Sequence, residues 1–324
     1  MSIRTDDLID RRRLRRKLTF WRVIAFLIIA LALAGSVRWL AGDRLGGLRP
    51  HVAQVRIEGT IVEDEELLER LERIRRTDAV KGVVLTIDSP GGTTAGGEAI
   101  FEQVRRLAEE KPVVAQVGTL ATSAGYMIAS AADHIVARQS SIVGSIGVIV
   151  QIPNISRLME TIGVSVVEVK SSPLKAEPSP FTPTTEEGRA MLRAMVLDSY
   201  DWFIGLVAER RPLSRAEVTT LADGSVFTGR QALERKLVDA LGGMREARAW
   251  LAEEKGVEES LEVIEWEPEG TASAWLLPGS AARWAAALVG LSERAGLLGR
   301  LGGESVFLDG LLSVWQPEAT RATD

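Results

Sequence analysis

Short apolar runs that resemble buried strands alternate with stretches of helical periodicity, and this alternation constrains the fold more than any other feature. The expected strands cover residues 51–57, 82–87, 112–117, 135–137, 146–150, 165–169 and 261–265. The expected helices cover residues 64–76, 96–110, 122–132, 156–162, 185–209, 216–222 and 229–235. Strands separated by helices pair in parallel through crossover connections, and such a sheet is covered by helices on both faces. The sequence therefore predicts an α/β fold around a mainly parallel sheet.

An uncharged apolar run precedes this body at residues 23–37. As a helix these residues would span about 22 Å, whereas a helix from Leu18 to Leu40 would span about 34 Å and cross the roughly 30 Å hydrocarbon core of a bilayer. Trp21 and Trp39 stand near the two ends, where aromatic side chains meet the membrane interface. We therefore expect a transmembrane signal anchor over residues 18–42.

The distribution of charge predicts how the expected anchor is oriented in the membrane. Residues 1–22 carry eight Lys or Arg and three Asp, a net charge of +5, and the rest of the chain, with 31 basic and 41 acidic residues, has a net charge of −10. The positive-inside rule keeps residues 1–17 in the cytoplasm and places the body outside the cytoplasmic membrane. A cleaved signal peptide is the alternative, since residues 32–34 read Ala-Leu-Ala, and it also exports the body. The acidic body argues against a nucleic-acid partner.

The lack of cysteine and the small number of histidines exclude several kinds of catalytic and metal site. The chain has no cysteine, which excludes disulfides, thiolate metal sites and a cysteine nucleophile. Its two histidines, His51 and His134, are too few for a three-histidine zinc site. We expect His134 to be structural and His51 to be exposed at the start of the first strand. No metal or cofactor is expected.

Two glycine-containing turns follow expected strands. Residues 88–92 read Asp-Ser-Pro-Gly-Gly, which is typical of a plain β–α turn or of a turn whose amides face a ligand. The phosphate-loop pattern is absent. Ser123 begins the helix that follows the next strand, as an ordinary N-cap or as a nucleophile whose oxyanion meets the amides of the helix.

A serine nucleophile needs a base, and lysine is the recurrent alternative to histidine. Lys175 lies in a proline-containing loop over residues 171–181, where a lysine is ordinarily a solvated charge. A lysine base has to be neutral, and burial by another element can supply that state.

Five ordered blocks between Val52 and Gly243 resemble the bacterial signal peptide peptidases of the protease IV family. They read GVVLTIDSPGG, TLATSAGYMIASAADHIVA, SSIVGSIGVI, VKSSPLKAEPSPF and DGSVFTGRQALERKLVDALGG. The resemblance implies a crotonase/Clp-protease-like spiral of mainly parallel strands flanked by helices, preceded by one transmembrane helix. It also implies a membrane-bound serine endopeptidase that cleaves signal-peptide remnants and other short apolar peptides. Members of the family form homo-oligomeric rings in which neighbouring subunits cover the active site.

Matched residue by residue, the resemblance assigns a Ser–Lys dyad. Ser123 corresponds to the nucleophile, Lys175 to the general base and Ser145 to a serine that orients the lysine. The amides of Gly92 and Ala124 correspond to the oxyanion hole. Ala124 replaces the family's glycine, so donation of its N–H requires a negative φ at this position.

Two other functions fit parts of this pattern. A crotonase-like acyl-CoA enzyme also uses paired amides, but it needs cytosolic coenzyme A and usually a catalytic glutamate. A non-catalytic membrane scaffold could keep the same fold, although the complete set of site residues favours the peptidase.

The expected organisation has four parts. A basic tail covers 1–17, the anchor 18–42, the peptidase domain 43–267 and an Ala/Leu/Trp-rich appendage 268–324. The appendage is either a helical segment that packs on the core or an element that contacts membrane, substrate or other subunits.

Overall fold

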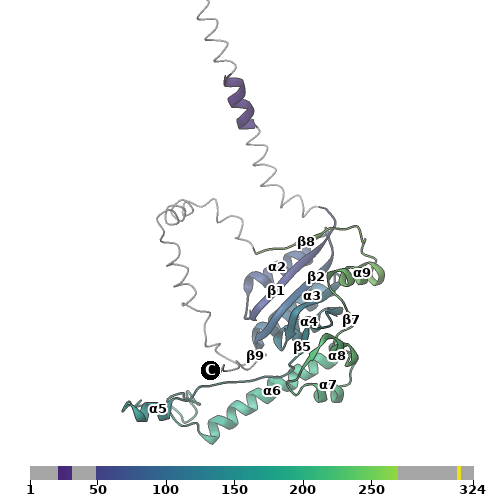
Figure 1. The fold of residues 1–324 in the computed structure, drawn as a ribbon. Helices are drawn as coiled ribbons and strands as arrows, with labels where there is room; N and C mark the ends of the chain where they lie inside the picture. Colours follow the sequence, from purple (N-terminus) through teal and green to yellow (C-terminus); the bar gives the residue numbers. More distant parts are fainter. Residues whose placement is uncertain (1–20, 31–48, 269–311, 315–324) are drawn as a thin grey trace, which may run out of the picture. The chain divides into compact units, whose positions relative to one another are not determined.

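The computed structural model describes residues 21–30, 49–268 and 312–314 of the chain. The chain divides into two compact units, Met1–Pro50 and His51–Asp324 (Figure 1). In the first unit residues 21–30 are helical, and the remainder of the expected anchor lies outside the described residues. None of the helices in the described ranges has the length and apolar character needed to span a bilayer.

Nine strands of the described chain form one sheet, in which β6-β5-β3-β2-β1-β8 is the main order and β4, β7 and β9 pair beside it. The strands are β1 (His51–Ile61), β2 (Val80–Thr93), β3 (Val113–Thr122), β4 (His134–Ala137), β5 (Ile142–Gly144), β6 (Val226–Thr228), β7 (Ala240–Leu241), β8 (Val263–Glu265) and β9 (Leu312–Val314). Only the β5–β6 and β2–β9 pairs are antiparallel among the described strands. The mainly parallel α/β sheet is therefore confirmed.

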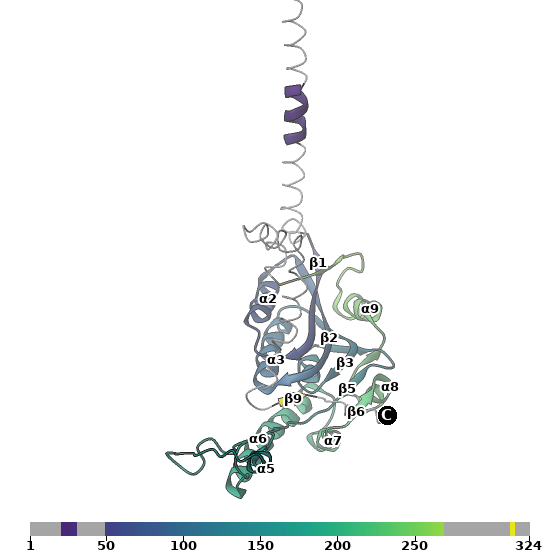
Figure 2. The ribbon, with the colours of Figure 1, turned by 60° about the vertical axis from the view of Figure 1, so that its left-hand side comes forward.

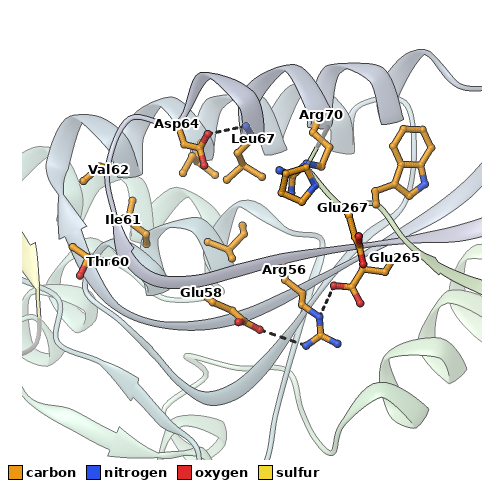
Figure 3. Close-up of a pocket in the computed structure, with 14 residues that line it drawn as sticks. Arg56, Glu58, Thr60, Ile61, Val62, Asp64, Leu67, Arg70, Glu265 and Glu267 are labelled. Atoms are coloured by element: carbon orange, nitrogen blue, oxygen red, sulfur yellow. Dashed lines mark hydrogen bonds and ion pairs between the residues drawn. The ribbon is translucent and has the colours of Figure 1, made fainter. Parts of the chain in front are cut away.

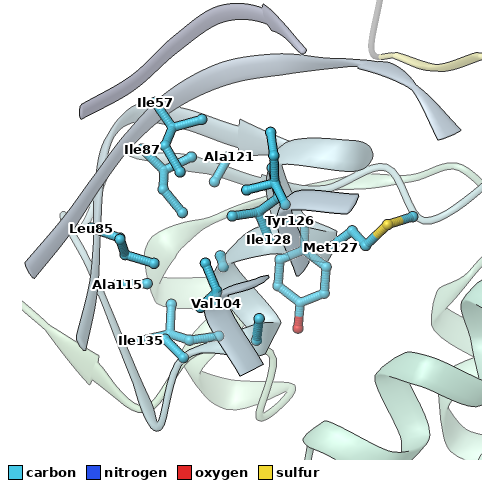
Figure 4. Close-up of a cluster of buried hydrophobic side chains, with 14 of the residues drawn as sticks. Ile57, Leu85, Ile87, Val104, Ala115, Ala121, Tyr126, Met127, Ile128 and Ile135 are labelled. Carbon is cyan, nitrogen blue, oxygen red and sulfur yellow. The ribbon is translucent and has the colours of Figure 1, made fainter. Parts of the chain in front are cut away.

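Helices cover both faces of this sheet because its central strands are apolar on both sides (Figures 1 and 2). One face packs against α2 (Glu65–Arg76), α3 (Thr94–Ala108) and α4 (Ala124–Ala131), and Figure 4 shows strand residues such as Leu85 and Ile87 in this core. Alternate strand residues point to the other face, where α9 (Met244–Lys255) covers them. Helix α9 is not among the helices expected from the sequence.

Two expected strands are wrong. Residues 146–150 follow strand β5 instead of forming one, and residues 165–169 are irregular. Among the described residues no strand pairs with the latter segment, and its Val167 and Val169 are 87% and 97% exposed. A strand requires a hydrogen-bonding partner as well as branched residues, and the part of the chain that the structure describes supplies none here.

An arm, defined as residues 146–185, connects the sheet to α6 (Glu186–Arg210) and contains α5 (Ser156–Thr161). In Figures 1 and 2, α5 lies near the free end of α6, away from the sheet. The other end of α6 enters the core through Phe203 and Val207 and leads to α7 (Arg215–Leu221) and α8 (Gly229–Glu234). Apolar side chains are exposed along the arm: Ile149, Ile152, Ile155, Leu158, Ile162, Val164, Val166, Val167, Val169, Leu174 and Phe181.

Both histidines stack on tryptophans. His134 stacks on Trp250 with ring centroids 4.8 Å apart, and burial lowers the pKa of this histidine. The expectation of an exposed His51 is wrong, because its side chain is 1% exposed. His51 stacks on Trp266, whose Nε1 donates a hydrogen bond to His51 Nε2 at 3.1 Å. This contact ties the start of β1 to the residues that follow β8.

Candidate active site

Ser123 lies at the junction of β3 and α4 in an unusual backbone conformation. Its φ and ψ are 56° and −119°, its side chain does not cap α4, and the residue is 1% exposed. A positive φ is unfavourable for a residue with a Cβ and persists only where the surroundings impose it. Here the Ser123 amide donates to the Gly144 carbonyl at 2.8 Å, and its carbonyl accepts from Met127 at 2.9 Å. A serine on a strained strand-to-helix turn is typical of a nucleophile.

The structure brings Ser145 next to this junction. Thr122 pairs with Gly144 between parallel strands β3 and β5, so Ser123 and Ser145 each follow a paired residue. Ser145 also has a positive φ of 52°, and its amide donates to the Ser225 carbonyl at 2.7 Å. Two serines with strained backbones thus leave adjacent strands at the same end of the sheet.

The glycine turn reaches the same end through β2. Ser89 of β2 pairs with Ala121 of β3, and a Cβ added to Gly125 would lie 2.9 Å from the Ser89 carbonyl oxygen. Gly92 itself passes so close to β1 that a Cβ would lie 1.8 Å from the Ile61 carbonyl oxygen. Only glycine fits at this position. Residues 88–92 were expected to form a turn, either a plain β–α turn or one whose amides face a ligand, but they continue strand β2 to Thr93.

Ala124 is the first residue of α4, so its N–H has no acceptor within the helix. Among the described non-glycine residues, positive φ values occur at Ser123, Ser145, Ala176 and Lys236, and Ala124 is not one of them. The condition for its N–H to serve an oxyanion in place of the family's glycine is therefore met.

Strand β9 pairs antiparallel with the end of β2, and the sequence did not indicate this contact. Leu312, Ser313 and Val314 lie opposite Thr93, Gly92 and Gly91. The edge that contains Gly92 therefore accepts an extended chain, as in proteins that bind peptides by strand addition. The three residues belong to the expected appendage, the rest of which beyond Pro268 lies outside the described residues.

Lys175 is held elsewhere. It lies on the exposed arm, and its side chain makes no hydrogen bond or ion pair among the residues that the structure describes. The arm joins the free end of α6, whose 25 residues extend about 37 Å from the arm to the core. Within one chain the structure thus gathers Ser123, Ser145, Gly92 and Ala124 but does not add Lys175 to them.

A separate pocket of about 500 Å³ lies between α2 and the end of β1 (Figure 3). Arg56 lines this pocket. Its Nε donates a hydrogen bond to Glu265 Oε1 at 2.7 Å, and its Nη1 donates one to Glu58 Oε1 at 3.4 Å. The pocket contains none of the expected site residues, although its lining residue Ile61 pairs with Gly92. No cluster of three or more acidic or histidine side chains in the described ranges could hold a metal ion.

Two protein-family models match the part of the chain that contains the candidate site. The model of peptidase family S49 matches residues 105–258, which include Ser123, Ser145 and Lys175. The Clp protease model matches residues 54–143, which contain the sheet strands that lead to Gly92 and Ser123. The Clp-protease-like character of the sheet is therefore confirmed.

Individual proteins show the same relationship. A putative protease of Synechocystis is 37% identical over 65% of this chain and 76% of its own length. A putative signal peptide peptidase of Enterococcus faecium is 35% identical over 65% of this chain, and a protein of Haemophilus influenzae named Protease 4 is 34% identical over 60%. The match spans 62% and 33% of these two relatives, less than two thirds of each. The chain belongs to peptidase family S49.

Proposed function

We propose that this protein is a single-pass membrane serine endopeptidase in which Ser123 of one subunit works with Lys175 of another. The observation that carries the proposal is the buried, strained Ser123 at the start of α4, beside a strand edge that already pairs with an extended segment. Family membership supports peptide-bond cleavage as the reaction.

Each site residue has a defined step in this mechanism. The neutral amine of Lys175 takes the Ser123 proton as the hydroxyl oxygen attacks the peptide carbonyl. The amides of Gly92 and Ala124 donate to the oxyanion that forms. The lysine ammonium then protonates the leaving amine, and water hydrolyses the acyl-enzyme with the lysine again acting as base. Ser145 accepts a hydrogen bond from the lysine and orients it.

The length of α6 supports a dyad formed between subunits. The arm that carries Lys175 is attached about 37 Å from the end of α6 that packs in the core. Lys175 is exposed in one chain, whereas a lysine base needs a dry environment. Exposed apolar side chains such as Val167 and Val169 belong to the same arm, and a second copy that covers the arm would bury them and Lys175 together. A homo-oligomeric ring meets both requirements.

The substrate class follows from the same strand edge. A peptide that pairs with residues 91–93 presents its backbone to the Gly92 amide and has to displace β9. Extended apolar peptides suit this mode, and a relative named a putative signal peptide peptidase supports remnants of signal peptides as substrates. The anchor at residues 18–42 would keep the enzyme in the cytoplasmic membrane with its catalytic domain outside. A reporter enzyme that functions only outside the cytoplasm should therefore be active when it is fused after residue 50.

A complementation experiment tests the proposal. The full-length protein in detergent should cleave a synthetic signal-peptide core, and Ser123→Ala and Lys175→Ala should each be inactive. Co-expression of the two variants in equal amounts should restore about one quarter of wild-type activity, since a quarter of random subunit contacts would join an intact serine to an intact lysine. Mixed oligomers without activity would show that the dyad does not form between subunits. Retained turnover in Lys175→Ala would show that the lysine is not the base.

A further inference from the structure

We propose that Lys170, Glu168 and Glu177 are positioning residues that hold the Lys175 turn in its working conformation. The inference rests on the proposed role of Lys175 as the base. We call this ion-paired group, together with Ser179, the clamp.

The clamp joins the two ends of the turn that contains Lys175. Lys170 Nζ lies 2.6 Å from Glu168 Oε2 and 2.7 Å from Glu177 Oε1. Ser179 Oγ donates to Glu168 Oε1 at 2.9 Å. The Glu177 side chain is 6% exposed, and those of Lys170 and Glu168 are 20% and 23% exposed, so these ion pairs are partly shielded from solvent.

The backbone between the two ends is also fixed. The Lys175 amide donates to the Ser172 carbonyl at 3.1 Å, and the Glu177 amide donates to the Leu174 carbonyl at 3.2 Å. Ala176 has a φ of 63°, a conformation that needs support from its neighbours. Lys175 therefore lies inside a turn that the clamp closes.

Glu177 connects this turn to the first residues of α6. Thr185 Oγ1 donates to Glu177 Oε2 at 3.5 Å and accepts from the Gly188 amide at 3.0 Å. A Cβ on Gly188 would lie 3.2 Å from Glu177 Oε2, so the carboxylate packs directly against the helix. The position of the turn is thus set by α6.

The other end of α6 is bound to the helix that begins after Ser123. Arg210 Nε donates to the Ser130 carbonyl at 3.1 Å, in the last turn of α4. Phe203 and Val207 anchor the same end of α6 in the core. The clamp therefore completes a continuous path of packed elements from α4 to the Lys175 turn. Catalytic groups that act on each other across a subunit contact need such support, because a displacement of about 1 Å can cost about 100-fold in rate.

The clamp also distinguishes the two lysines of this segment. Lys170 donates hydrogen bonds to Glu168 and Glu177, and these bonds raise its pKa, so this lysine stays protonated. A permanently charged Lys170 suits a structural role and not that of a base. Lys175 has no carboxylate partner among the described residues and remains available to a second subunit.

Steady-state kinetics of the full-length protein on a signal-peptide core tests the clamp. Lys170→Met and Glu177→Gln should each lower kcat at least about tenfold with KM within about twofold, because the base is displaced while the peptide-binding edge is intact. The kcat of the double variant should be no lower than that of the less active single variant, since both substitutions break the same interaction. Lys170→Arg should restore most of the activity, because a guanidinium can bond both carboxylates.

The matched control is Glu186→Gln, the same chemical change at an exposed first residue of α6, which should leave kcat unchanged. Hydrogen exchange should quicken in residues 171–177 of the clamp variants but not in the control, and thermal unfolding of the body should not shift. Glu168→Gln supplies an independent third variant should one of the others fail to assemble.

The outcomes separate this inference from the proposed function. Normal kcat in all clamp variants, together with an inactive Lys175→Ala, would overturn the clamp and leave the dyad standing. An active Lys175→Ala would overturn both. Additive losses in the double variant would show that Lys170 and Glu177 do not act through each other, which also contradicts the clamp.

Discussion

The strand ends around Ser123 and the arm around Lys175 differ in how much of their structure one chain supplies. Around Ser123, each element is fixed by neighbours from the same chain: β3 pairs with β2, β4 and β5, and all eight residues of α4 are buried. The arm is held by the clamp, by its contact with α6 and by hydrogen bonds within itself, such as that from the Ile155 amide to the Pro180 carbonyl, and much of its apolar surface faces solvent. We infer that the proposed nucleophile is prepared by folding, whereas the proposed base becomes functional only on assembly.

Because of this contrast, mutations in the two regions should affect different properties of the protein. Changes around Ser123 should alter the stability of the folded chain. Changes on the arm should alter activity and assembly while the stability of the chain stays the same.

The largest effect on activity is expected for Lys175→Ala. Loss of a general base lowers kcat by about 10²–10⁴-fold. The melting temperature should not change, because the exposed side chain has no partner among the described residues. Peptide hydrolysis and calorimetry on the same preparation provide the check, and a lowered melting temperature would mean that Lys175 also stabilises the chain.

Gly92→Ala should combine both kinds of effect. The new Cβ would lie 1.8 Å from the Ile61 carbonyl oxygen, so β1 and β2 have to separate. We expect about 10²–10³-fold lower kcat from the displaced oxyanion donor and about 1–3 kcal/mol lower unfolding free energy. Gly243→Ala is the matched control, since its added Cβ meets nothing within 4 Å. Equal effects of the two variants would contradict the role of the close strand contact.

Replacing Val167 and Val169 together by Asp should act on assembly. Both side chains are almost fully exposed, and charges at an apolar subunit contact are unfavourable. We expect a smaller oligomer by light scattering in detergent and about tenfold lower activity, with an unchanged melting temperature. Ala216→Asp, at an exposed position of α7, should change none of these. An intact oligomer in the double variant would exclude this surface as a subunit contact.

The smallest expected effect is that of Tyr126→Phe. The Tyr126 hydroxyl donates to the Leu237 carbonyl at 2.9 Å inside the core. Its removal should lower the unfolding free energy by about 1–2 kcal/mol, because a buried carbonyl loses its donor. Denaturant titration measures this change, and kcat per folded molecule should stay within about twofold. A large loss of kcat without a loss of stability would reverse the proposed division between the two regions.

Much of the central fold could be predicted from local pattern. The runs at residues 82–87 and 112–117 are buried on both faces of the sheet, so their apolar character alone identified them as strands. Their true lengths could not be predicted, because Asp-Ser-Pro-Gly-Gly extends β2 through its pairing with β1, β3 and β9. The same limit explains residues 165–169, which have a strand-like composition but no partner strand within residues 49–268.

The sequence by itself supplied the order of the blocks that resemble a known family, and this resemblance assigned Ser123, Ser145, Lys175, Gly92 and Ala124 as the candidate site. It also determined that neither cysteine nor a histidine cluster could carry the chemistry. Only the tertiary structure decided which of these residues meet, because strand register and the length of α6 place the two serines together and hold Lys175 at the far end of a helix. Spacing along a chain does not encode such distances, which arise when separate segments pack against one another.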